Sequence, residues 1–165
     1  PTRPTAYGTP CSCPRCSGNG YSRAWESEAM SMEFSVTASG GCHCGRVRYR
    51  VLGPLRPVVN CHCDPCRRIT GHFLAATSAQ LGDVLFDSDE TLTWYHPTDT
   101  VQYGFCDRCG STLFWRADDK ARSLSIAAGT LDQPTGLTTD LALFGDDAGD
   151  YHNLDTSIET VPGDR

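Results

Sequence analysis

The region that decides the fold is the stretch CHCDPC, residues 61–66, which places three cysteines within six residues. Two similar clusters lie on either side of it, CHC at 42–44 and CDRC at 106–109. A disulfide needs Cβ atoms about 3.8 Å apart, and cysteines so close in sequence rarely reach that geometry without strain. Thiols separated by one or two residues are typical of metal sites. The spacing therefore predicts a fold built around bound metal.

The cysteines of these three clusters number seven, too few for two complete four-thiolate zinc sites. They divide naturally into four and three. We expect a closed, structural zinc site formed by Cys42, Cys44, Cys106 and Cys109. We expect an open, catalytic zinc site formed by Cys61, Cys63 and Cys66, whose fourth position is left for water or substrate. The sequence thus predicts two Zn²⁺ ions per chain.

Most of the remaining sequence has the pattern of short strands. Residues 45–52 alternate, with Val47, Tyr49 and Val51 on one face and arginines on the other, as in a half-buried strand. Further strand candidates, rich in Thr, Val and aromatic residues, are 73–78, 83–87, 91–95, 101–105, 112–116 and 123–128. Only residues 66–70 and the region of Lys120 could be helical. The pattern predicts an all-β domain.

Residues 1–40 are rich in Pro, Gly, Ser and Thr and show no sustained period. We expect the zinc-binding domain to span residues 33–165, and residues 1–32 to be a flexible extension or a mis-assigned start outside the native chain. This leader contains Cys11, Cys13 and Cys16, which repeat the spacing of residues 61–66. A third metal site in the leader is the alternative interpretation.

The composition excludes several classes of protein. Hydrophobic residues make up 39% of the chain, which is the composition of a globular domain and not of a disordered one. The formal net charge is −6, so nucleic acid and anionic membranes are not expected partners. No run of 18 apolar residues occurs, and residues 1–32 lack the apolar stretch of a secretory signal. We therefore expect a cytoplasmic protein.

In order and spacing, the segments GCHCG (41–45), CHCDPCR (61–67) and FCDRCGS (105–111) resemble the glutathione-dependent formaldehyde-activating enzyme family, which shares its domain with centromere protein V. Residues 127–132 and 147–151 resemble its C-terminal segments. The resemblance implies an Mss4-like fold, with several short antiparallel sheets built around two zinc sites. It implies the same division into structural and catalytic cysteines. It also implies carbon–sulfur lyase activity, which reversibly joins glutathione to formaldehyde as S-hydroxymethylglutathione.

For this chemistry the substrate thiol, such as glutathione, would fill the open position beside Cys61, Cys63 and Cys66, and Arg67 or Arg68 would bind a substrate carboxylate. Candidates for proton transfer are His62, His72, Tyr95 and His96. The alternative function is a non-catalytic, zinc-stabilised protein-binding module of the same fold. A thiol redox site is less favoured, because no βαβ pattern surrounds either C-x-x-C motif. Iron–sulfur binding ranks below zinc, because iron–sulfur clusters generally use longer cysteine runs of other spacing.

Overall fold

The computed structural model describes residues 35–164. The prediction for residues 1–32, including Cys11, Cys13 and Cys16, lies outside the described residues. Within them, the strands are β1 (Ala38–Gly41), β2 (Arg48–Val51), β3 (Val58–Cys61), β4 (Leu74–Gln80), β5 (Val84–Ser88), β6 (Leu92–Tyr95), β7 (Val101–Cys106), β8 (Thr112–Ala117), β9 (Ser123–Ala127), β10 (Thr139–Leu143) and β11 (Glu159–Thr160). The helix α1 spans Asp64–Thr70, and short 3₁₀ turns η1 to η4 cover Leu81–Asp83, Asp118–Lys120, Ala128–Thr130 and Gly145–Asp147.

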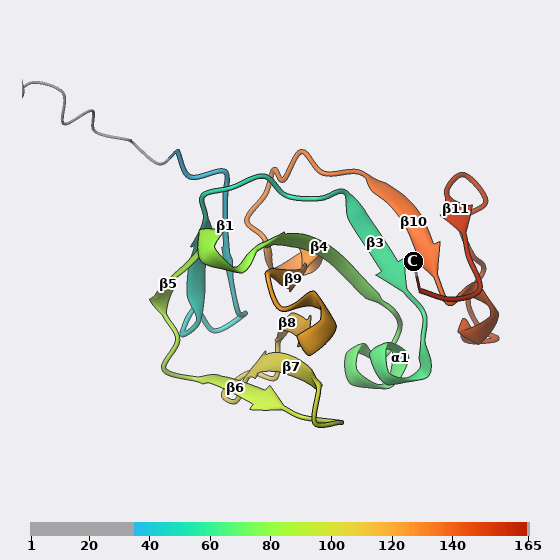
Figure 1. Cartoon of the computed structure of the whole chain (residues 1–165), viewed down its shortest axis with the longest axis horizontal. Coiled ribbons are helices and arrows are strands. Elements are labelled where there is room, and N and C mark those ends of the chain that lie inside the picture. The colour runs from blue at the N-terminus through green and yellow to red at the C-terminus, as the bar shows by residue number, and fades with distance from the viewer. Residues whose placement is uncertain (1–34, 165) are drawn as a thin grey trace, which may run out of the picture. The chain divides into compact units, whose positions relative to one another are not determined.

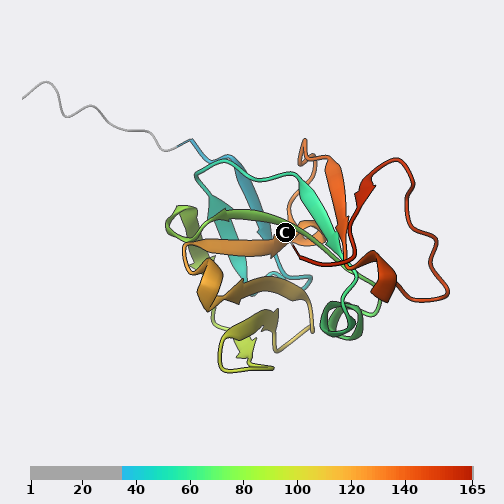
Figure 2. The ribbon, with the colours of Figure 1, turned by 45° about the vertical axis from the view of Figure 1, so that its right-hand side comes forward.

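The strands form two sheets (Figure 1). The smaller has the order β1-β2-β5 and is antiparallel. The larger has the order β11-β10-β3-β4-β9-β8-β7-β6. It is antiparallel except at β10, which runs parallel to both β3 and β11, so the larger sheet is mixed (Figure 2). The predicted all-β fold class is confirmed.

Two predicted elements begin two or more residues away from their expected starts. The strand expected over 45–52 begins only at Arg48, because Gly45 has a φ of 76° and closes the turn that carries Cys42 and Cys44. The helix expected over 66–70 begins earlier, at Asp64, because Pro65 favours the first helical turn and Asp64 places a carboxylate there. The Lys120 region forms a single 3₁₀ turn.

The main core lies between the two sheets. Alternate residues of β2, Tyr49 and Val51, are fully buried against Phe114, Leu124 and Ile126 of the larger sheet. The Tyr49 and Phe114 rings meet edge to face, with centroids 5.1 Å apart. This packing covers one face of the larger sheet and leaves its other face for a second cluster.

The second cluster gathers around α1. Cys66 packs there with Leu74, Ala76, Tyr103 and Ala127. Trp115 belongs to this cluster while its neighbour Phe114 belongs to the main core, since successive residues of a strand point to opposite faces. Within residues 35–164, no helix is long and apolar enough to cross a membrane.

Candidate metal centres

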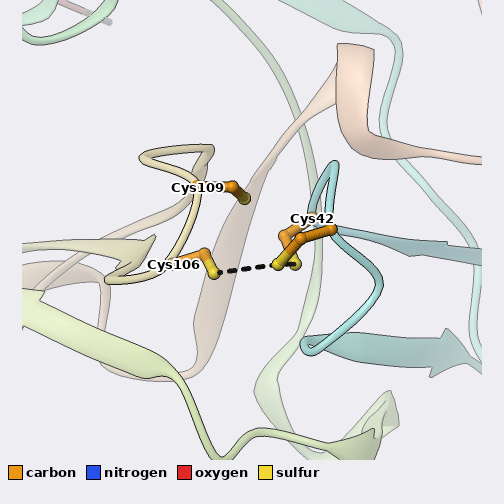
Figure 3. A group of neighbouring side chains, drawn as sticks. Cys42, Cys106 and Cys109 are labelled. Atoms are coloured by element: carbon orange, nitrogen blue, oxygen red, sulfur yellow. Dashed lines mark hydrogen bonds between the residues drawn. The ribbon is translucent and has the colours of Figure 1, made fainter.

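The first candidate centre joins two turns that are distant in sequence. Cys42 and Cys44 lie on the turn between β1 and β2, while Cys106 ends β7 and Cys109 lies on the turn that leads to β8. Figure 3 shows Cys106 and Cys109 projecting toward Cys42 on the facing turn. The four sulfurs lie within 4.8 Å of one another. We call this group the four-cysteine cluster.

The distances in the four-cysteine cluster fit a tetrahedral ion. The Sγ atoms of Cys42 and Cys44 are 3.5 Å apart, and those of Cys44 and Cys106 are 3.7 Å apart. A tetrahedral zinc with bonds of about 2.3 Å separates its sulfurs by about 3.8 Å. A disulfide would require about 2.05 Å, and all seven cysteines in the described residues are free thiols.

Backbone and hydroxyl groups surround these sulfurs. Gly110 has a φ of 74°, and its N–H donates to the Cys106 carbonyl at 2.8 Å, which closes the second turn as Gly45 closes the first. The Val47 N–H donates to Cys42 Sγ at 3.2 Å. The hydrogen bond between the Ser111 hydroxyl and Cys109 lowers the pKa of that thiol to about 5. The contact with Ser111 favours the thiolate form of Cys109.

The second candidate centre is local. Cys61 ends β3, Cys63 precedes α1 and Cys66 lies in its first turn. Their sulfurs also lie within 4.8 Å of one another, with Cys61 Sγ and Cys63 Sγ 3.4 Å apart. Figure 1 shows α1 where the chain passes from β3 to β4. We call this group the three-cysteine cluster.

The thiols of the three-cysteine cluster are hydrogen-bonded to one another, and these hydrogen bonds shift their pKa values. The Cys61 thiol donates to Cys63, which lowers the pKa of Cys63 to about 3 and raises that of Cys61 to about 11. Hydrogen bonds to Cys61 and Cys63, together with burial, raise the pKa of Cys66. Without a cation only one of the three sulfurs therefore ionises readily, whereas a divalent cation would stabilise all three thiolates.

The two clusters differ in their position relative to the large cavity. Cys61, Cys63 and Cys66 line a cavity of about 780 Å³ on the face of the larger sheet that the main core leaves free. Within residues 35–164, the lining of this cavity includes no member of the four-cysteine cluster. Cys42 and Cys106 are buried, with 6% and 0% of their surface exposed. The two clusters therefore differ in position: Cys44 of the four-cysteine cluster is exposed at the surface, whereas the three-cysteine cluster faces a ligand-sized cavity.

Tyr103 was missed by the sequence analysis. Its hydroxyl lies 3.5 Å from Cys66 Sγ, and the residue lines the same cavity. Burial raises the pKa of Tyr103, so the hydroxyl stays protonated at neutral pH. The contact joins β7 to α1 across 37 residues, and no local spacing in the sequence indicates it.

The predicted substrate arginines lie outside the cavity lining. Arg67 and Arg68 both pair with Asp64 on α1, at 2.8 and 2.9 Å. Arg67 keeps one buried donor, Nε, without a hydrogen-bond partner among residues 35–164. The assignment of these two arginines to a substrate carboxylate stays a prediction.

The predicted proton-transfer residues do not line the large cavity. The buried His62 ring stacks on His152 with centroids 5.4 Å apart, and His72 meets His152 edge to face at 4.5 Å. Tyr95 lines a separate cavity of about 310 Å³, and His96 is exposed. The lining of the larger cavity, as far as residues 35–164 form it, contains none of these four candidates.

Comparisons with known proteins agree with the arrangement. The sequence profile described as glutathione-dependent formaldehyde-activating enzyme matches residues 37–147. A Halomonas elongata protein that bears the name of this family is 31% identical over 83 residues, which cover 46% of this chain and 53% of that protein. The chain therefore spans about half the length of the curated relative it matches. A crystal structure of a Rhodobacter sphaeroides protein is similar with a TM-score of 0.51 and 26% identity, over 61% of this chain and 97% of that one.

Proposed function

The chain belongs to the glutathione-dependent formaldehyde-activating enzyme family, and from this premise we propose that it is a zinc-dependent carbon–sulfur lyase. Its substrate would be a thiol–aldehyde adduct such as S-hydroxymethylglutathione, which it would form and cleave reversibly. The observation that carries the proposal is the three-cysteine cluster facing a cavity of about 780 Å³. The free thiols suit a reducing compartment, and we propose that the protein works in the cytoplasm.

Both clusters fit zinc by their donors and distances. Cys42, Cys44, Cys106 and Cys109 would hold a structural ion, and Cys61, Cys63 and Cys66 would hold a catalytic one. Bound at the three-cysteine cluster, zinc would supply a Lewis acid that keeps a substrate sulfur as thiolate at neutral pH.

The residues of the chain supply the remaining requirements. Cleavage of a thiol–aldehyde adduct breaks the C–S bond and forms a carbonyl, while the hydroxyl proton of the adduct ends on the sulfur. Tyr103 Oη, beside Cys66, would relay this proton: it would donate its own proton to the departing sulfur and accept the hydroxyl proton of the adduct in return. Leu74, Val101 and Trp115 line the cavity and would exclude water from it.

The direct test measures exchange between glutathione, formaldehyde and their adduct by NMR. The zinc-loaded protein should accelerate the exchange, and Cys66→Ser should abolish the acceleration. Leu85→Ala, an exposed position on β5 outside the cavity, is the control variant and should leave the rate unchanged. A folded, zinc-loaded protein that leaves the exchange rate at the uncatalysed value would refute the lyase and favour the non-catalytic binding module.

A further inference from the structure

The cavity beside the three-cysteine cluster is much larger than formaldehyde. Its volume of about 780 Å³ is in the range of pockets for drug-sized ligands, about 300–1,000 Å³. Formaldehyde contributes only one carbon and one oxygen to its adduct with a thiol. Most of the cavity is therefore available to the rest of the substrate, which is the thiol or a substituent on the aldehyde carbon.

The floor of the cavity is apolar next to the cysteines. Cys61 on β3 is paired with Leu74 on β4, and the next pair on the same face is Val59 with Ala76. All four residues line the cavity. Residues two apart on a strand are separated by about 6.6 Å. If the substrate sulfur lies beside Cys61, a substituent on it would extend over Leu74 and then over Val59 and Ala76.

Other strands add apolar side chains to the same cavity. Val101 on β7 and Trp115 on β8 face it from one direction, and Leu141 and Leu143 on β10 from the other. These four side chains are only partly buried. A ligand with an apolar group would remove this surface from water, and that removal favours binding.

The charged side chains around the cavity do not favour an anionic substituent on the substrate. The ionisable side chains in the lining, apart from the cysteines and Tyr103, are Arg56, Lys120, Asp140, Glu159 and Asp164. Two are cationic and three are acidic, and Lys120 is paired with Asp164 at 2.8 Å. The cavity therefore offers no excess of positive charge, and its apolar floor is the feature that can discriminate between substrates.

We propose that the preferred substrate is the adduct of a thiol with a bulky apolar aldehyde, such as an arylalkyl aldehyde, and not the formaldehyde adduct. This inference rests on the proposed lyase function. In the reaction the C–S bond breaks with its electron pair left on sulfur, the hydroxyl proton passes to that sulfur, and the carbonyl forms. The step is balanced without an oxidant or reductant.

The first test measures binding and does not depend on turnover. S-benzylglutathione and S-methylglutathione are stable thioethers that imitate a bulky and a small adduct. Calorimetry with the zinc-loaded full chain should show the benzyl compound binding about tenfold more tightly or better, because its ring covers the apolar floor. Equal affinities would overturn the inference.

Two variants locate the effect in the cavity. Ala76→Phe would fill the floor and should remove the advantage of the benzyl compound. Val59→Thr keeps the volume but adds a hydroxyl, so it should reduce that advantage even if Ala76→Phe fails to fold. Leu85→Phe, on the exposed part of β5, adds the same ring outside the cavity and is the matched control. A benzyl advantage that survives both cavity variants would overturn the assignment.

The second test measures turnover of the two kinds of adduct. With glutathione, NMR exchange should give a kcat/KM for phenylacetaldehyde about tenfold or more above that for formaldehyde. A preference for formaldehyde would overturn the inference and leave the lyase function intact. If neither adduct reacts, the lyase function fails, and thioether binding alone decides the apolar specificity.

Discussion

The four-cysteine and three-cysteine clusters present the same ligand type in two different arrangements. The first brings together turns whose nearest cysteines, Cys44 and Cys106, are 62 residues apart. The second gathers its sulfurs from six consecutive residues at the start of α1. A metal ion bound at the first would therefore fix the relative position of β1-β2 and β7-β8, whereas an ion bound at the second would fix only one strand end and one helix.

The surroundings of the clusters differ in the same way. The four-cysteine cluster is in contact with the main core through Cys42 and Cys106. The three-cysteine cluster is part of the second apolar cluster and opens onto the cavity. Under the proposed zinc assignment, the site with four protein ligands would serve the fold, and the site with one open ligand position would serve chemistry.

The largest expected effect is the loss of the fold when the four-cysteine cluster is damaged. Structural zinc contributes about 10–16 kcal/mol of apparent free energy, comparable to the whole stability of a domain. Cys106→Ser should therefore unfold the domain, as measured by circular dichroism. Cys66→Ser should retain the spectrum of the native protein. Equal unfolding of both variants would contradict the division of the seven cysteines.

The second effect concerns the hydroxyl of Tyr103. Tyr103→Phe removes the proton donor beside Cys66 and should lower the exchange rate about 100-fold, with zinc content and circular dichroism unchanged. Tyr151→Phe, at a position 63% exposed, is the matched control. A Tyr103→Phe variant with the native rate would assign proton transfer to another residue.

The third effect is the pH dependence of metal binding at the three-cysteine cluster. Raised pKa values keep protons on Cys61 and Cys66 at pH 7, and zinc must displace them. Each displaced proton weakens binding about tenfold per pH unit as the pH falls. The affinity should therefore drop up to about 100-fold between pH 7 and pH 6. Calorimetry in buffers of different ionisation enthalpy would count the released protons, and release of none would contradict the expectation.

The smallest effect is kinetic. A chelator should remove zinc from the three-cysteine cluster about tenfold or more faster than from the four-cysteine cluster, because an ion there would have only three protein ligands and would face the large cavity. A colorimetric zinc indicator should record two kinetic phases of zinc release. The circular dichroism spectrum should not change during the first phase. A single phase, or loss of secondary structure in the first phase, would contradict the expected difference in zinc release between the two clusters.

The sequence predicted the parts of the molecule that depend on local spacing. The alternation of Val47, Tyr49 and Val51 and the other short strand candidates predicted the all-β fold class. The cysteine spacing predicted groups of four and three, and the structure brings the seven sulfurs together in those groups. The C-x-C and C-x-x-C spacings constrain the turns directly, since each must place two sulfurs on one ion.

The parts that the sequence did not predict depend on contacts between distant strands. Tyr103 reaches Cys66 only because β7 and α1 meet in the fold. The parallel pairing of β10 with β3 is likewise long-range, and β10 was absent from the predicted strands. The salt bridges of Arg67 and Arg68 with Asp64 could have been anticipated, because positions three and four apart on a helix are neighbours.

Strand β7 carries one residue that contacts the three-cysteine cluster and one that belongs to the four-cysteine cluster. Tyr103 contacts Cys66, and three residues later Cys106 contributes a sulfur to the other cluster. The two centres therefore share one strand, and a displacement of β7 would move a residue at both of them. We therefore expect their metal affinities to be thermodynamically linked, and linkage requires that each ion influences the binding of the other by the same factor.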